Sequence, residues 1–259
     1  MATGPDRADS SGNPASSRPV VGALRVWDLP LRLFHWLLAA LVSAAVVTVK
    51  LGGDDWMVWH ERCGRAILVL LAFRLAWGFA GSREARFRTF VRGPRAVLAS
   101  VRDLPRRLSN RYRGHNPLGG WSVLAMLAAL ITQGVTGLFA NDDATFEGPL
   151  AGRVSKATSD WSTSIHTTGE WVLYGLVALH LAAIAWYWLR KGDNLLMPMI
   201  TGDKTVSSAV SSATSSAEVS KAASGTETAG GTDGARLWLR AVVLAALATA
   251  LVLLLTARG

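Results

Sequence analysis

The chain contains little cysteine and little charge. Cys63 is the one cysteine among 259 residues, which excludes an internal disulfide framework and a zinc site built on paired cysteines. Charged residues make up 17% of the sequence, against roughly 25% in an average soluble domain. The sequence also has no Gly-x-Gly-x-x-Gly after a predicted strand, no phosphate-binding loop and no nucleophile elbow, so the common soluble enzyme classes find no support.

Hydrophobic residues, in contrast, make up 50% of the chain and gather in five stretches. Each stretch approaches or reaches roughly 20 residues, the length at which a helix crosses the hydrocarbon of a bilayer. The stretches are 33–49, 66–80, 121–140, 171–189 and 237–256. We therefore predict an all-α integral membrane protein, in which a four-helix bundle is followed by a flexible linker and a fifth, C-terminal transmembrane helix.

Two segments of low complexity mark the expected domain boundaries. Residues 1–22 are rich in Ser, Pro, Gly and Asp and lack the basic-then-apolar order of a secretion signal, so we expect a disordered cytoplasmic N-terminus. Residues 203–235 are dominated by Ser, Ala, Thr and Gly, the composition of a flexible linker. The predicted domains are thus a four-helix membrane domain over 23–202 and a C-terminal transmembrane helix over 236–259.

Arginine sets the predicted orientation, because short cytoplasmic loops carry an excess of basic residues. The segment 82–115 holds ten arginines, whereas the loops before the second and fourth spans balance acids against bases. The N-terminus and the arginine-rich segment are therefore expected in the cytoplasm, and the protein in the inner (plasma) membrane of a bacterium. Predicted membrane spans flank the basic segment on both sides. Contact with anionic lipid therefore explains the net charge of +9 better than nucleic-acid binding does.

Histidine is scarce, and four of the five histidines lie in or at the predicted spans. Ionisable groups inside a membrane are costly and usually functional. In the predicted topology His35 lies near the inner start of the first span, while His60 and His166 lie at the outer starts of the second and fourth. His180 follows His166 by 14 residues, about 21 Å along a helix and within roughly 40° of the same face. The fourth helix therefore presents two histidines on one face, at two levels.

Depth allows one pairing of these histidines. His35 faces His180 on the inner side (the inner pair), and His60 faces His166 on the outer side (the outer pair). The iron of a b-type haem requires two axial nitrogens from opposite sides, and helix bundles hold cofactors with ligands from facing helices. Two protein ligands suit tetrahedral zinc less well, and a covalent haem would need Cys-x-x-Cys-His, which is absent. We therefore predict two haem b groups with the four histidines as iron ligands.

Arg74 completes the predicted cofactor-binding set. It follows His60 by 14 residues and so lies on nearly the same face at the inner level, where an arginine requires an anion such as a haem propionate. Snorkelling to the cytoplasmic surface is the alternative. Gly64 and Gly137 would leave room for a porphyrin ring. His115 has no partner at its depth, and we expect a structural or proton-handling role for it.

The chain resembles the prokaryotic cytochrome b561 family of four-helix dihaem membrane proteins over about residues 25–203. The resemblance rests on short segments, and on the histidines of the second and fourth helices. These are Val26-Trp27-Asp28, Phe34-His35-Trp36, His60, Arg74-Leu75-Ala76-Trp77-Gly78, Gly114-His115-Asn116-Pro117-Leu118-Gly119, and His166 with His180. The Gly-His-Asn-Pro-Leu-Gly segment is similar to hydrogenase-type cytochrome b subunits. Residues 203–259 depart from the family's four-helix pattern.

The resemblance implies electron transfer across the membrane, between the quinone pool and a redox partner. The partners it suggests are a hydrogenase, a dehydrogenase or a soluble cytochrome c. One branch of the family instead implies superoxide:ubiquinone oxidoreductase activity, so whether the chain is itself an enzyme stays open. An alternative of another class is a non-redox transporter that moves protons or a substrate through the membrane histidines. A membrane-anchored scaffold is a third.

Overall fold

The structure is a computed structural model that describes residues 22–104, 116–144, 146–206 and 232–257. Five of its helices are long and apolar enough to cross a membrane. They are α1 (Leu29–Leu51), α2 (Asp54–Ala80), α5 (Pro117–Leu138), α6 (Lys156–Lys191) and α9 (Thr232–Thr256). The prediction of an all-α membrane bundle with a fifth, C-terminal helix is confirmed.

Polar caps and prolines mark the starts of α1 and α5. The Asp28 side chain accepts a hydrogen bond from the Leu31 amide at 2.7 Å and so caps α1, whose first turn contains proline. Asn116 does the same for α5 through the Gly119 amide at 2.6 Å, and Pro117 is the first residue of that helix, a position that favours proline. Two of the segments behind the family resemblance therefore begin helices.

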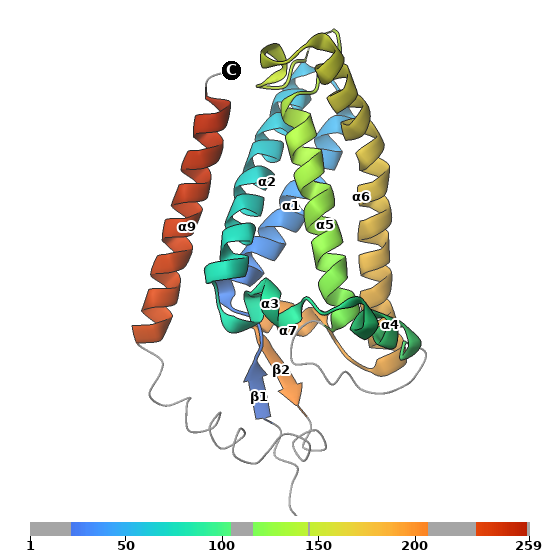
Figure 1. The fold of residues 1–259 in the computed structure, drawn as a ribbon, viewed down its shortest axis with the longest axis vertical. Helices are drawn as coiled ribbons and strands as arrows, with labels where there is room; N and C mark the ends of the chain where they lie inside the picture. Colours follow the sequence, from blue (N-terminus) through green and yellow to red (C-terminus); the bar gives the residue numbers. More distant parts are fainter. Residues whose placement is uncertain (1–21, 105–115, 145, 207–231, 258–259) are drawn as a thin grey trace, which may run out of the picture.

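The four bundle helices pack in sequence, with α1 on α2, α2 on α5 and α5 on α6 (Figure 1). The best-buried large side chains are on α2, where Leu71 is 1% exposed and Trp77 is 0% exposed. Large apolar side chains also cover the outside, among them Phe79 at 75% and Leu189 at 78%. A continuous apolar exterior of this kind is suited to lipid rather than to water.

The fifth helix, α9, lies along α2 on the outside of the bundle (Figure 1). Its buried positions include Ala241, Ala248 and Val252, while Leu247 and Leu254 are exposed. Small residues on one face allow helix backbones to approach closely within a membrane. α9 therefore turns its small face to the bundle and its leucine-rich face outward.

The two ends of the bundle carry different elements (Figure 1). One end carries the described part of the basic segment, which includes η1 (Arg83–Ala85), α3 (Phe87–Phe90) and α4 (Pro94–Arg102), together with α7 (Leu196–Thr201). The other end carries the loop between α5 and α6, which includes η2 (Ala151–Arg153). The basic segment thus lies at one end of the bundle.

A two-stranded ribbon at the arginine-rich end was not expected. β1 (Gly22–Arg25) pairs antiparallel with β2 (Asp203–Val206), so that Arg25 lies opposite Asp203. The ribbon uses the last residue of the expected N-terminal segment 1–22 and the first four of the expected linker 203–235. α9 likewise begins at Thr232, before the expected boundary at 236. The pairing of β1 with β2 joins the two ends of the membrane domain through backbone hydrogen bonds, which composition does not record.

Candidate haem site

The structure brings the four predicted ligand histidines together as two pairs of facing rings. His35 of α1 and His180 of α6 have ring centres 6.5 Å apart with planes inclined by 53°. His60 of α2 and His166 of α6 have ring centres 6.0 Å apart with planes inclined by 88°. The inner pair lies toward the arginine-rich end, and the outer pair lies toward the opposite end. These are the two pairings that helix depth predicts.

The ring spacings fit a shared metal atom. A metal–imidazole bond is about 2 Å long, and the ring centre lies roughly 1 Å beyond the nitrogen, so two rings on one atom have centres roughly 6 Å apart. Both observed separations match this value. Among the described residues no group of three or more His, Cys, Asp or Glu side chains converges. Each pair therefore offers two protein ligands, the number that a porphyrin-bound iron requires.

Backbone carbonyls fix the tautomer of the outer pair. His60 Nδ1 lies 2.9 Å from the Ala45 carbonyl oxygen, and His166 Nδ1 lies 2.9 Å from the Gln133 carbonyl oxygen. A carbonyl oxygen only accepts hydrogen bonds, so each Nδ1 donates and each Nε2 keeps its lone pair. Metal-binding histidines are commonly oriented in this way. The outer pair is thus prepared to bind a metal through Nε2.

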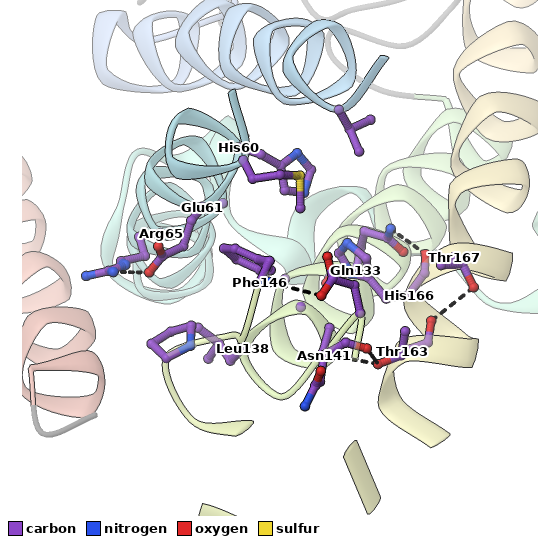
Figure 2. A pocket seen from close by; sticks show the side chains of 18 of the residues that line it. His60, Glu61, Arg65, Gln133, Leu138, Asn141, Phe146, Thr163, His166 and Thr167 are labelled. Carbon is purple, nitrogen blue, oxygen red and sulfur yellow. Dashed lines mark hydrogen bonds and ion pairs between the residues drawn. The ribbon is translucent and has the colours of Figure 1, made fainter. Parts of the chain in front are cut away.

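A cavity adjoins the outer pair, between α2, α5, α6 and the loop that follows α5. Gly64, Gly134 and Gly137 line it, and Figure 2 shows Phe146 of the loop entering it between the side chains of α2 and those of α5 and α6. A Cβ added at Gly137 would lie 2.9 Å from His166 Cε1, whereas one at Gly64 would meet nothing within 4 Å. Gly137 thus allows the His166 ring its position.

Arg74 lies inside the protein at the inner end of α2. Its side chain is 2% exposed, so the snorkelling alternative is wrong, because Phe87 and neighbouring core residues enclose it. The guanidinium lies 4.8 Å from the Phe87 ring centre, and its Nη1 has no hydrogen-bond partner among the described residues. A buried guanidinium with an unmet donor is suited to binding an anion. The predicted partner is a haem propionate.

Comparison with known proteins identifies the family. A family model described as prokaryotic cytochrome b561 matches residues 26–202. The chain belongs to this family. Three probable Ni/Fe-hydrogenase B-type cytochrome subunits are similar to it. That of Bradyrhizobium diazoefficiens is 25% identical over 237 residues, which cover 78% of this chain and 94% of the relative.

The other two relatives are slightly more distant. That of Rhodobacter capsulatus is 24% identical and covers 70% of this chain and 80% of its own length. That of Azotobacter chroococcum mcd 1 is 23% identical and covers 70% of this chain and 88% of its own length. No solved structure matches the chain. As a member of the cytochrome b561 family, the protein is a multi-pass membrane protein that uses b-type haem to transfer electrons across the membrane.

Several residues of this cytochrome b561 site were not expected from the sequence. Gln133 donates through Nε2 to the His166 carbonyl oxygen at 2.7 Å, while its own carbonyl accepts from the His166 ring. A polar amide inside a predicted span was the signal that could have identified it. Asp28 was noted only as part of a motif, yet it accepts hydrogen bonds from Trp77 Nε1 at 3.2 Å and from the Ser82 hydroxyl. His115 lies outside the described residues.

Proposed function

We propose that this cytochrome b561 family member holds two haem b groups in series and passes electrons between a hydrogenase partner and the quinone pool. The observation that carries the proposal is the pair of facing-histidine sites at two levels of one bundle, with ring centres 6.5 and 6.0 Å apart. α6 supplies one histidine to each level. A bundle with a single ligand pair would support one site and no internal electron path.

The four histidines, the Ala45 and Gln133 carbonyls and Arg74 have separate roles in this proposal. His35 and His180 hold the inner group, and His60 and His166 hold the outer group. When bound, haem iron exchanges one electron at a time between its ferric and ferrous states. The Ala45 and Gln133 carbonyls orient the outer ligands, and Arg74 holds an anionic haem substituent at the inner level.

The proposed partner follows from the relatives. All three are named as cytochrome subunits of a Ni/Fe-hydrogenase, and the family match spans both histidine pairs. A quinone is proposed as the other partner, because a carrier dissolved in the bilayer can reach the bundle from its lipid-facing side. Transport without redox chemistry has less support, because facing histidine rings at metal-ligand spacing are not needed to move protons.

The proposed placement is the bacterial inner membrane with the arginine-rich end in the cytoplasm. Six arginines of the described basic segment lie at that end, where the positive-inside rule places them. They are Arg83, Arg86, Arg88, Arg92, Arg95 and Arg102. The four-helix domain over 23–202 then carries both haem sites, and the helix after the linker adds a fifth span that ends outside.

Spectra of ligand variants test the proposed function. The haem content per chain is measured for His180→Ala and His166→Ala, with His115→Ala as the matched histidine control outside the two pairs. We expect each ligand variant to lose one haem per chain and the control to keep both. Unchanged haem content in both ligand variants would refute the proposal. Reduction of the remaining haem by a short-chain quinol then tests the quinone connection.

A further inference from the structure

The two histidine pairs differ in the hydrogen bonds made by their Nδ1 atoms. Both outer ligands have a backbone carbonyl at 2.9 Å, Ala45 for His60 and Gln133 for His166. In the inner pair, His35 Nδ1 is buried without a hydrogen-bond partner among the described residues. His180 likewise makes no hydrogen bond to a described residue. The outer ligands are thus hydrogen-bonded at both rings and the inner ligands at neither.

This difference changes how strongly the rings donate electrons to a metal. An imidazole whose N–H donates to a carbonyl oxygen carries more negative charge on its other nitrogen, and it is the more basic ligand. A more basic ligand stabilises ferric iron, which has the higher charge, more than ferrous iron. Hydrogen bonding around the ligands is one of the ways a protein sets a haem potential.

We infer that the Ala45 and Gln133 carbonyls give the outer haem the lower reduction potential of the two, so that an electron shared between the sites resides mainly at the inner pair. The inference rests on the proposed function, because it requires a haem at each pair. It goes beyond that function by stating which of the two haems has the lower reduction potential. Electrons that enter at the outer end then move inward spontaneously.

Nearby charges do not reverse this order. Glu170 lies one turn after His166, but Lys50 of α1 pairs with it at 2.6 Å. At the inner end, Asp28 is the acid whose field acts on Arg74. The outer site thus has two acid–base pairs beside it, Glu170 with Lys50 and Glu61 with Arg65, and the inner end has Asp28 near Arg74. Within each pair the opposite charges largely cancel. The ligand hydrogen bonds remain as the difference between the two sites.

Gln133 is the positioning residue of the outer site. Its side-chain amide donates to the His166 carbonyl oxygen at 2.7 Å and so ties α6 to α5 where the His166 ring meets the Gln133 carbonyl. Gly169 makes room for this amide, because a Cβ there would lie 2.4 Å from Gln133 Oε1. Removing the amide is expected to loosen the ring hydrogen bond while all four ligands stay in place.

An equilibrium redox titration of the full-length protein, followed by haem absorbance, tests the inference. His35→Leu/His180→Leu leaves the outer site and His60→Leu/His166→Leu leaves the inner site, so the two potentials can be assigned. We expect the reduction potential of the outer haem to lie at least about 59 mV below that of the inner haem. This difference corresponds to a tenfold equilibrium constant for moving one electron from the outer haem to the inner one. Gln133→Leu should raise the lower potential alone by a similar factor, and Thr132→Val, an exposed neighbour on α5, should change neither.

The outcomes separate the inference from the function on which it rests. A haem with the lower potential at the outer site, raised by Gln133→Leu, supports both. Two haems in the opposite order, or a Gln133→Leu shift confined to the higher potential, would overturn the inference and leave the two-haem proposal intact. A wild-type chain without haem would overturn both.

Discussion

Gly137→Ala offers a small perturbation aimed at one of the two sites. The new Cβ would lie 2.9 Å from His166 Cε1 and 3.2 Å from Nδ1, closer than van der Waals contact. The ring must therefore move by several tenths of an ångström, away from the position in which Nδ1 reaches the Gln133 carbonyl at 2.9 Å. Leaving that buried donor unsatisfied costs about 1–3 kcal/mol, so haem affinity at the outer pair should fall by a factor of roughly 5 to 150.

The assay is the haem-to-chain ratio of purified protein during dilution or competition with a haem-binding protein. We expect the ratio for Gly137→Ala to fall toward one, with the remaining haem at His35 and His180. Gly175→Ala is the matched control on α6, because a Cβ there meets nothing within 4 Å, and it should behave as wild type. Full retention of both haems by Gly137→Ala, under conditions in which wild type also keeps both and His166→Ala keeps one, would refute the reasoning.

Three further predictions concern the inner end and the fifth helix. Arg74→Leu should lower haem retention at the inner pair, measured by the haem-to-chain ratio, and Arg74→Lys should lower it less. Full haem retention by Arg74→Leu would exclude a propionate contact. Asp28→Ala removes the α1 cap and leaves the Trp77 and Ser82 donors without their acceptor, so it should lower the free energy of unfolding by roughly 2–4 kcal/mol. Asp28→Asn should lower it much less, and equal Tm values for the two variants would contradict this. A chain ending at Val206 should keep both haems with a lower Tm, because every proposed ligand lies in α1, α2 or α6; haem loss would show that α9 builds a site.

The sequence predicts the number and order of the spans well, but their lengths poorly. The second span was expected from residue 66, whereas α2 begins at Asp54, and α6 begins at Lys156 rather than near 171. A search for apolar residues finds the part of a helix that lies in hydrocarbon, and the polar turns that extend the helix beyond it escape notice. His60 and His166 therefore lie well inside helices rather than at their starts.

The histidine pairing could be predicted because it depends only on span order and helix rise. The contacts around the rings could not. Ala45 and His60 are 15 residues apart, and Gln133 and His166 are 33 apart. Which carbonyl meets which ring depends on the rotation and approach of packed helices, a property of tertiary structure that residue spacing does not contain.

The reduced-minus-oxidised spectrum of the wild-type chain, measured together with its haem-to-chain ratio, tests the central proposal most directly. Two pairs of facing histidines predict a b-type spectrum and two haems per chain. A ratio of one would show that one of the pairs does not hold haem. A chain without haem, produced where haem is plentiful, would contradict the account.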